Sequence, residues 1–246
     1  MRVLGLETAS EQGCVGLLED DRPLCELVFE ATMAHGEKLL PAIEAALKLS
    51  GISKRDLELI AVSRGPGSFT GLRIGLAIAK GLARALGIPL VGVPGFAVYA
   101  RKVAPWPGPV WVLLPDRREW LYVSVFRSGE EILAPQVLAL EELLARLRAG
   151  ESVREGERAL LLGPGVEAHR EALAQARGPG VLAPAALNLP SGVEIARLGR
   201  ERFSREGRDE LRELEPLYVQ EPPIRVPSQR PSQRQPRAQK AVSPAS

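Results

Sequence analysis

Apolar and polar positions at the start of the chain form short runs that are typical of β-strands. The runs RVLGLETA (2–9), CVGLLED (14–20) and LCELVFE (24–30) are separated by the turn-prone segments SEQG and DDRP. Short separations of this kind favour direct reversals of the chain. Residues 2–30 therefore predict three antiparallel strands in succession.

The apolar pattern then changes to a helical period. In residues 35–51 the apolar side chains recur at i, i+1, i+4, i+7 and i+8, and Gly51 stands where a helix commonly ends. A strand (57–65), a helix (68–86) ended by Gly87 and Pro89, and a further strand (89–94) are expected to follow. Three strands followed by alternating helices and strands predict an α/β fold.

A similar pattern begins again after a Pro- and Gly-rich segment near residues 101–108. It predicts a hairpin (110–129), a helix (138–150), a strand (159–165) and helices at 166–176 and 190–207, the last capped by Ser191. We therefore predict two αβ lobes, residues 1–104 and 105–220. Residues 221–246 repeat PSQR, are rich in Pro, Gln and Arg, and are expected to be a disordered basic tail.

The composition of the chain limits the classes of protein to which it can belong. An apolar content of 45% can fill a core, and a net charge of +2 is not that of a generally basic nucleic-acid binder. No apolar run reaches the roughly 18 residues of a membrane span, and no signal peptide is apparent. Because Cys14 and Cys25 are the only cysteines, we expect no disulfide framework and a cytoplasmic location. The excess of Arg over Lys and the single asparagine lean towards a thermophilic source.

The segment SRGPGSFTGLRIGLAIAKGLARALGIP (63–89) begins like a phosphate-binding loop. However, Lys80 lies well inside the predicted helix and is followed by Gly81, whereas a Walker loop needs Ser or Thr directly after its lysine. Gly65, Gly67 and Gly71 are spaced one residue too widely for the dinucleotide fingerprint. Neither standard nucleotide motif is present.

Small residues recur at every fourth position through this helix: Gly67, Gly71, Gly75, Ala79 and Ala83. Each helix-interior glycine costs about 0.5–1 kcal/mol relative to alanine, so the pattern implies that something packs very closely. Two interpretations are open. The helix lies tightly on its own sheet, or the helix of a second chain meets this stripe.

Catalytic and metal-binding patterns are missing. His35 and His169 are the only histidines, and neither stands at a metal-ligand spacing from another ligand. His35, at a helix start, is expected to be a capping or partner-contact residue. No Gly-x-Ser-x-Gly elbow surrounds Ser68, and Cys14 in a predicted strand is expected to be inert. We predict no catalytic residue and no metal site.

Two strand ends carry carboxylates. Glu7 precedes Thr8 and Ser10 in a turn that can present oxygens to a phosphate or a metal. Asp116 precedes two arginines at the end of a later strand. Each is more simply explained as a turn or ion-pair residue than as a catalytic one.

Four segments together resemble the TsaB (YeaZ) family. They are LGLETAS (4–10), HGEKLLPAIEAAL (35–47), SRGPGSFTGLRIGLAIAKGLARALGIPLVGV (63–93) and LEPLYV (214–219). The resemblance covers about residues 1–220, and its most specific part is RGPGSFTGLRIG. It implies the two-lobed α/β fold of the actin, sugar-kinase and Hsp70 (ASKHA) superfamily, with a mixed five-stranded sheet in the first lobe.

The resemblance also implies a function. TsaB proteins take part in forming threonylcarbamoyladenosine at position 37 of transfer RNA, as non-catalytic heterodimer partners of TsaD. TsaD binds ATP and a metal and transfers the threonylcarbamoyl group, and the ATPase TsaE joins the complex. This chain is accordingly expected to bind no cofactor alone, to meet tRNA only through the complex, and to form a homodimer when isolated.

By the same resemblance, residues 35–50 and 68–86 form the helical interface with TsaD or with a second copy, and the small-residue stripe is assigned to that contact. The expected contact residues are His35, Leu39, Leu40, Ile43, Leu47, Gly67, Gly71, Ile74, Gly75, Ile78, Ala79 and Leu82. Glu7, Thr8 and Ser10 remain as a vestigial phosphate turn, although relatives commonly carry Asp in place of Glu7. Asp116 and Arg117 match the family pattern, but the sequence after them is compressed.

Two further hypotheses remain. The chain is a small ATP-binding phosphotransferase or ATPase of the same superfamily, or its tail assists tRNA binding electrostatically. The basic residues of the tail are Arg225, Arg230, Arg234, Arg237 and Lys240.

Overall fold

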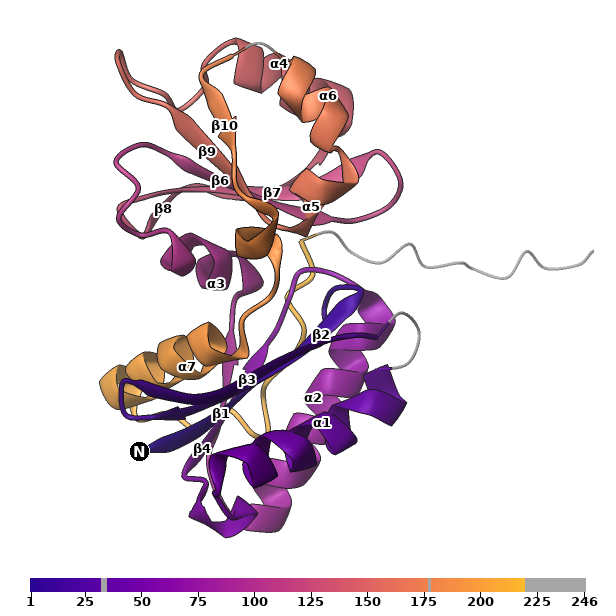
Figure 1. Ribbon diagram of the computed structural model, residues 1–246, viewed down its shortest axis with the longest axis vertical. Coiled ribbons are helices and arrows are strands. Elements are labelled where there is room, and N and C mark those ends of the chain that lie inside the picture. Colours follow the sequence, from indigo (N-terminus) through magenta and orange to yellow (C-terminus); the bar gives the residue numbers. More distant parts are fainter. Residues whose placement is uncertain (32–34, 177, 220–246) are drawn as a thin grey trace, which may run out of the picture.

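The chain contains two five-stranded sheets, each with its own helices (Figure 1). The computed structural model describes residues 1–31, 35–176 and 178–219. The order of the first sheet is β3 (Arg22–Glu30), β2 (Gln12–Glu19), β1 (Arg2–Glu7), β4 (Leu59–Ser63) and β5 (Leu90–Val93). β1, β2 and β3 are antiparallel, while β4 and β5 run parallel to β1. The predicted opening meander and the mixed five-stranded sheet are confirmed.

The second sheet repeats this topology. Its order is β10 (Gly180–Leu182), β9 (Ala159–Leu162), β6 (Val110–Pro115), β7 (Trp120–Arg127) and β8 (Glu130–Ala139). As in the first sheet, the strand that begins the lobe is central, with an antiparallel neighbour on one side and a parallel one on the other. β8 was not predicted. It is an edge strand that contains a proline, so its sequence lacks the regular alternation of a buried strand.

Helices α1 (His35–Ser50) and α2 (Phe69–Leu86) cover one face of the first sheet (Figure 1). Leu4, Leu6 and Ile60 point to these helices, whereas their strand neighbours Val3 and Leu59 point to the opposite face. The Ser68 hydroxyl accepts a hydrogen bond of 3.2 Å from the Gly71 amide, and Gly87 adopts a left-handed φ of 69° that ends the helix. Both predicted limits of α2 are thus confirmed.

The remaining helices connect the sheets or cover the second one. They are α3 (Gly95–Lys102), α4 (Leu140–Arg148), α5 (Pro164–Ala168) and α6 (Arg170–Gln175), with 3-10 turns at Lys54–Asp56 and Ala185–Asn188. The single helix predicted at 166–176 is two short helices that meet at His169. None of the described helices is long and apolar enough to cross a membrane.

Helix α7 (Gly192–Glu206) packs on the first sheet, on the face opposite α1 and α2 (Figure 1). Its buried residues Val193, Ile195 and Ala196 join the cluster built on Val3 and Leu59. The predicted assignment of all of residues 105–220 to the second lobe is therefore wrong, since the chain crosses back before α7. The sequence predicted this helix and its cap but carried no information on which sheet the helix covers.

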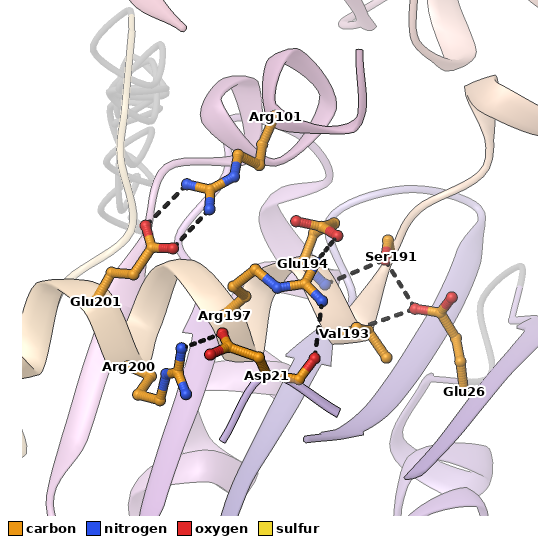
Figure 2. A network of polar contacts seen from close by, with 9 residues as sticks. All are labelled: Asp21, Glu26, Arg101, Ser191, Val193, Glu194, Arg197, Arg200 and Glu201. Atoms are coloured by element: carbon orange, nitrogen blue, oxygen red, sulfur yellow. Dashed lines mark hydrogen bonds and ion pairs between the residues drawn. The ribbon is translucent and has the colours of Figure 1, made fainter. Parts of the chain in front are cut away.

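Figure 2 shows the polar contacts that hold α7 in place. The Glu26 carboxylate on β3 accepts hydrogen bonds from the Ser191 hydroxyl at 2.8 Å and from the Val193 amide at 3.0 Å. Ser191 in turn accepts a hydrogen bond from the Glu194 amide, so its predicted capping role is confirmed. Arg101 on α3 forms a two-pronged pair with Glu201, at 2.8 and 2.6 Å. The tail 221–246, with its expected disorder and basic residues, lies outside the described residues.

Candidate functional site

The glycine-rich loop after β4 packs directly on the turn between β1 and β2. The Ser68 amide donates a hydrogen bond of 2.7 Å to the Ala9 carbonyl, and the Thr8 hydroxyl donates one of 2.9 Å to the Gly71 carbonyl. A Cβ atom built on Gly67 would overlap Ala9, and one built on Gly71 or Gly75 would overlap Thr8. The glycines therefore make room for this turn of the same chain.

The assignment of the small-residue stripe to a second chain is therefore wrong. Ala79 and Ala83, which continue the stripe, are fully buried in the core between α2 and the first sheet. The expected contact residues Leu39 and Ile43 lie in the same core. The spacing correctly indicated a close approach, but the approaching group is a turn more than sixty residues earlier in the chain, which no local pattern identifies.

The turn that was predicted as a vestigial phosphate site is enclosed. Glu7 is buried and accepts hydrogen bonds from the amides of Ala9 (2.6 Å) and Thr8 and from the hydroxyl of Ser63. Burial raises the pKa of the Glu7 carboxyl, and these hydrogen bonds act in the opposite direction. Tyr99 packs into the same junction, where burial and the nearby Glu7 raise the pKa of its hydroxyl.

The space at this junction is very small. Residues from both lobes, among them Ser10, Pro66, Gly95 and Leu114, line a cavity of about 10 Å³ next to Glu7. That is roughly the room for a single water molecule, whereas pockets for small-molecule ligands measure about 300–1,000 Å³. The space beside Glu7 is therefore too small for a nucleotide.

The other candidate residues have structural partners. Asp116 accepts a hydrogen bond of 2.9 Å from the Tyr122 hydroxyl and pairs with Arg117 at 3.7 Å. Cys14 accepts a hydrogen bond from the Gly192 amide, and burial raises the pKa of its thiol. Within residues 1–31, 35–176 and 178–219, no three His, Cys, Asp or Glu side chains gather where they could hold a metal ion. The His35 side chain lies outside the described residues.

The outer side of α1 and α2 is accessible, in contrast to the junction. These helices lie side by side, and five of the expected contact residues are exposed or only half-buried there: Leu40, Leu47, Ile74, Ile78 and Leu82. We call these five residues the α1–α2 face. Leu40 is 44% exposed, and Leu49, which was not among the expected contacts, is 73% exposed. Apolar side chains left partly exposed on two neighbouring helices are typical of a protein contact surface.

An aromatic cluster at the start of α2 was missed by the sequence reasoning. Phe69 and Tyr218 have ring centroids 5.8 Å apart, and the Arg73 guanidinium lies 3.8 Å from the Phe69 centroid. Both rings are 42% exposed. The only available signal was the pair of segments that carry the family resemblance, since the two rings are far apart in the sequence.

Known proteins with similar sequences fall into one group. The family model described as TsaD, tRNA N6-adenosine threonylcarbamoyltransferase, matches residues 29–199. The tRNA threonylcarbamoyladenosine biosynthesis protein TsaB of Bacillus subtilis is 28% identical over 208 residues, which cover 82% of this chain and 88% of that protein. YeaZ from Pseudomonas aeruginosa has a structure with a TM-score of 0.69 and 25% identity, covering 88% of this chain and 99% of that one. The chain belongs to the TsaB (YeaZ) family.

Other proteins match a shorter part of the sequence or share the fold alone. The TsaB of Escherichia coli is 40% identical over 93 residues, covering 38% of this chain and 40% of that protein. A tRNA N6-adenosine threonylcarbamoyltransferase of Solidesulfovibrio magneticus is 38% identical over 108 residues, covering 38% of this chain and 29% of the transferase. The ethanolamine utilization protein EutJ of Carboxydothermus hydrogenoformans shares the fold, with a TM-score of 0.55 at 13% identity, over 81% of this chain and 90% of EutJ. The predicted two-lobed α/β fold is confirmed.

Proposed function

We propose that this chain is a non-catalytic scaffold and activator subunit of a complex that forms N6-threonylcarbamoyladenosine in tRNA. In this role the α1–α2 face binds a TsaD-type catalytic subunit, and TsaE joins the pair. ATP and the metal belong to the partner, and tRNA is contacted through the assembled complex. Support comes from membership of the TsaB family, whose Bacillus subtilis member is named for this biosynthesis.

The observation that carries the proposal is the contrast between the enclosed junction and the accessible helices. Next to Glu7 only about 10 Å³ is free, while Leu40 on α1 is 44% exposed. A subunit that performs phosphoryl transfer needs an open site for its nucleotide, and a subunit that acts through association needs an accessible apolar surface. The junction at Glu7 lacks the first feature, and the α1–α2 face has the second.

Reconstitution tests the proposal. Modified tRNA is measured with TsaD, TsaE, ATP, threonine, bicarbonate and the enzyme that forms the threonylcarbamoyl adenylate, with and without this chain. We expect modification only when the chain is present, and no modification when TsaD is omitted. Equal modification without the chain would remove the proposal.

The alternative is a small ATP-binding phosphotransferase or ATPase. Calorimetric titration of the isolated chain with ATP and magnesium separates the two functions. Our proposal predicts no saturable heat, because the amide of Ser68 and the turn at Thr8 are engaged within the chain. Saturable binding accompanied by phosphate release would favour the alternative.

A further inference from the structure

The chain crosses between its two lobes twice. It passes from α3 to β6 of the second sheet, and it returns from β10 to α7, which covers the first sheet. We call the returning residues 183–191 the crossing segment. α3 itself lies between the lobes, since Phe96 and Tyr99 pack on the second sheet while Val98 joins the cluster around α7 (Figure 1). The relative position of the lobes therefore depends on α3 and on the crossing segment.

Lys102, the last residue of α3, holds the crossing segment by its main chain. Its ammonium group donates hydrogen bonds of 2.8 Å to the Leu187 carbonyl and of 2.6 Å to the Leu189 carbonyl. The side chain is half-buried, and burial lowers the pKa of the ammonium group. Because hydrogen bonds from a charged donor are stronger than those between neutral groups, the two contacts offset this loss of hydration.

Asn188, between these two carbonyls, ties the same segment to the second lobe. Its buried side chain accepts a hydrogen bond of 2.8 Å from the Gly163 amide and donates one to the Glu167 carboxylate on α5. Arg170, which pairs with Glu167, donates a further hydrogen bond of 3.2 Å to the Ala183 carbonyl. The second lobe thus holds the crossing segment at two points.

The first lobe holds the other end of the segment. The Ser191 hydroxyl donates to the Glu26 carboxylate, and the next amide along the chain, that of Gly192, donates a hydrogen bond of 3.0 Å to the Cys14 sulfur (Figure 2). Cys14 is fully buried. Movement of the start of α7 away from β2 would expose its thiol, so Cys14 can report on this contact.

We propose that the crossing segment acts as a clasp, whose contacts with Lys102 and, through Asn188, with α5 keep the two lobes closed against each other beside Glu7. Lobes joined by short segments are expected to move relative to each other unless specific contacts prevent it. The junction beside Glu7 is lined by residues of both lobes and leaves only about 10 Å³ free. Because the clasp consists of the chain's own groups, closure of this junction needs no ligand. The inference goes beyond the proposed function and concerns this chain alone.

Removal of the ammonium group tests the clasp in the full chain. Lys102→Met keeps an unbranched side chain and removes the donor. Hydrogen exchange in the crossing segment and alkylation of Cys14 should each quicken about tenfold, as expected for the loss of a hydrogen bond to a charged group. The radius of gyration from X-ray scattering should increase because the lobes separate. Half-buried Cys25 is the internal reference for alkylation and should react as it does in the parent.

The matched control is Lys54→Met, which changes the net charge equally at an exposed position of the first lobe and should behave as the parent in all three measurements. Asn188→Ala removes the contacts with α5 and should give the same three changes as Lys102→Met. It serves if Lys102→Met fails to fold.

Three results would overturn the inference. If exchange quickens equally in β1 and β6, the contacts stabilise the whole fold rather than the arrangement of the lobes. If exchange quickens only in the crossing segment and the radius of gyration stays the same, the segment does not set the position of the lobes. If neither changes, the lobes are held by other contacts.

Discussion

The Thr8 hydroxyl and the Gly71 carbonyl oxygen are joined by a hydrogen bond of 2.9 Å, which fixes the β1–β2 turn against the first turn of α2. The same threonine occupies the space that a side chain at Gly71 or Gly75 would need. Since Ala9 closes the other end of this contact against Gly67, the glycines of the family signature build the interior of the first lobe.

Gly75→Leu is therefore expected to destabilise the monomer. The new side chain would overlap Thr8, and overpacking of this kind costs about 1–3 kcal/mol or more. Urea unfolding of the isolated chain measures the loss. Gly81→Ala on the exposed side of the same helix is the control and should raise stability by about 0.5–1 kcal/mol, because its Cβ meets nothing. An unchanged unfolding midpoint for Gly75→Leu, together with lost association, would restore the second-chain interpretation.

Much of the fold was predictable because its signals are local. The short apolar runs in 2–30, the helical period in 35–50 and the capping residues Ser68 and Gly87 each act within a few residues. The location of α7 and the partner of the glycine stripe were not predictable, because both depend on contacts between distant segments. For the same reason the sequence placed Leu39 and Leu40 in one interface, although only Leu40 is exposed.

Buried Glu7 should make stability depend on pH. Burial raises the pKa of Glu7 in the native state above its ordinary value of 4.5. At a pH between the ordinary and the native pKa, the native state holds a proton that the unfolded state releases. Stability therefore falls as pH rises through this window, and this fall is the cost of the buried charge.

Glu7→Gln removes that cost and keeps a carbonyl oxygen for the Ala9 amide. We expect the variant to be more stable than the parent at pH 7, with a difference that closes as the pH falls towards about 4.5. Urea unfolding across this range measures it, and Glu11→Gln at an exposed position is the control. A difference that does not change with pH would show that the Glu7 charge is not its source.

The start of α7 should depend on two polar side chains. Ser191→Ala removes the cap, and Glu26→Gln removes the charge that accepts the Val193 amide, so each should cost about 1 kcal/mol. Hydrogen exchange should quicken most in the first turn of α7. Ser204→Ala, at an exposed position of the same helix, is the control. Because Ser191 also donates to Glu26, the double variant should lose less than the sum of the single losses.

Substitutions at Leu40 and Ile132 distinguish a loss of partner binding from the general effect of changing an exposed apolar side chain. They are 44% and 47% exposed, the first on α1 and the second on strand β8 of the other lobe. Lysine at either position should change stability by no more than about 0.5 kcal/mol, since neither side chain is in the core. Leu40→Lys should nevertheless weaken association with TsaD about tenfold or more, because it places a charge in an apolar contact.

The reconstituted reaction supplies the functional readout. With Leu40→Lys, threonylcarbamoyladenosine formation should fall when the chain is limiting and recover when it is in excess, as expected for weakened assembly of an otherwise intact subunit. Ile132→Lys should match the parent at both concentrations. Equal losses for the two variants would place the contact surface elsewhere, because exposed apolar area alone would then explain the effect.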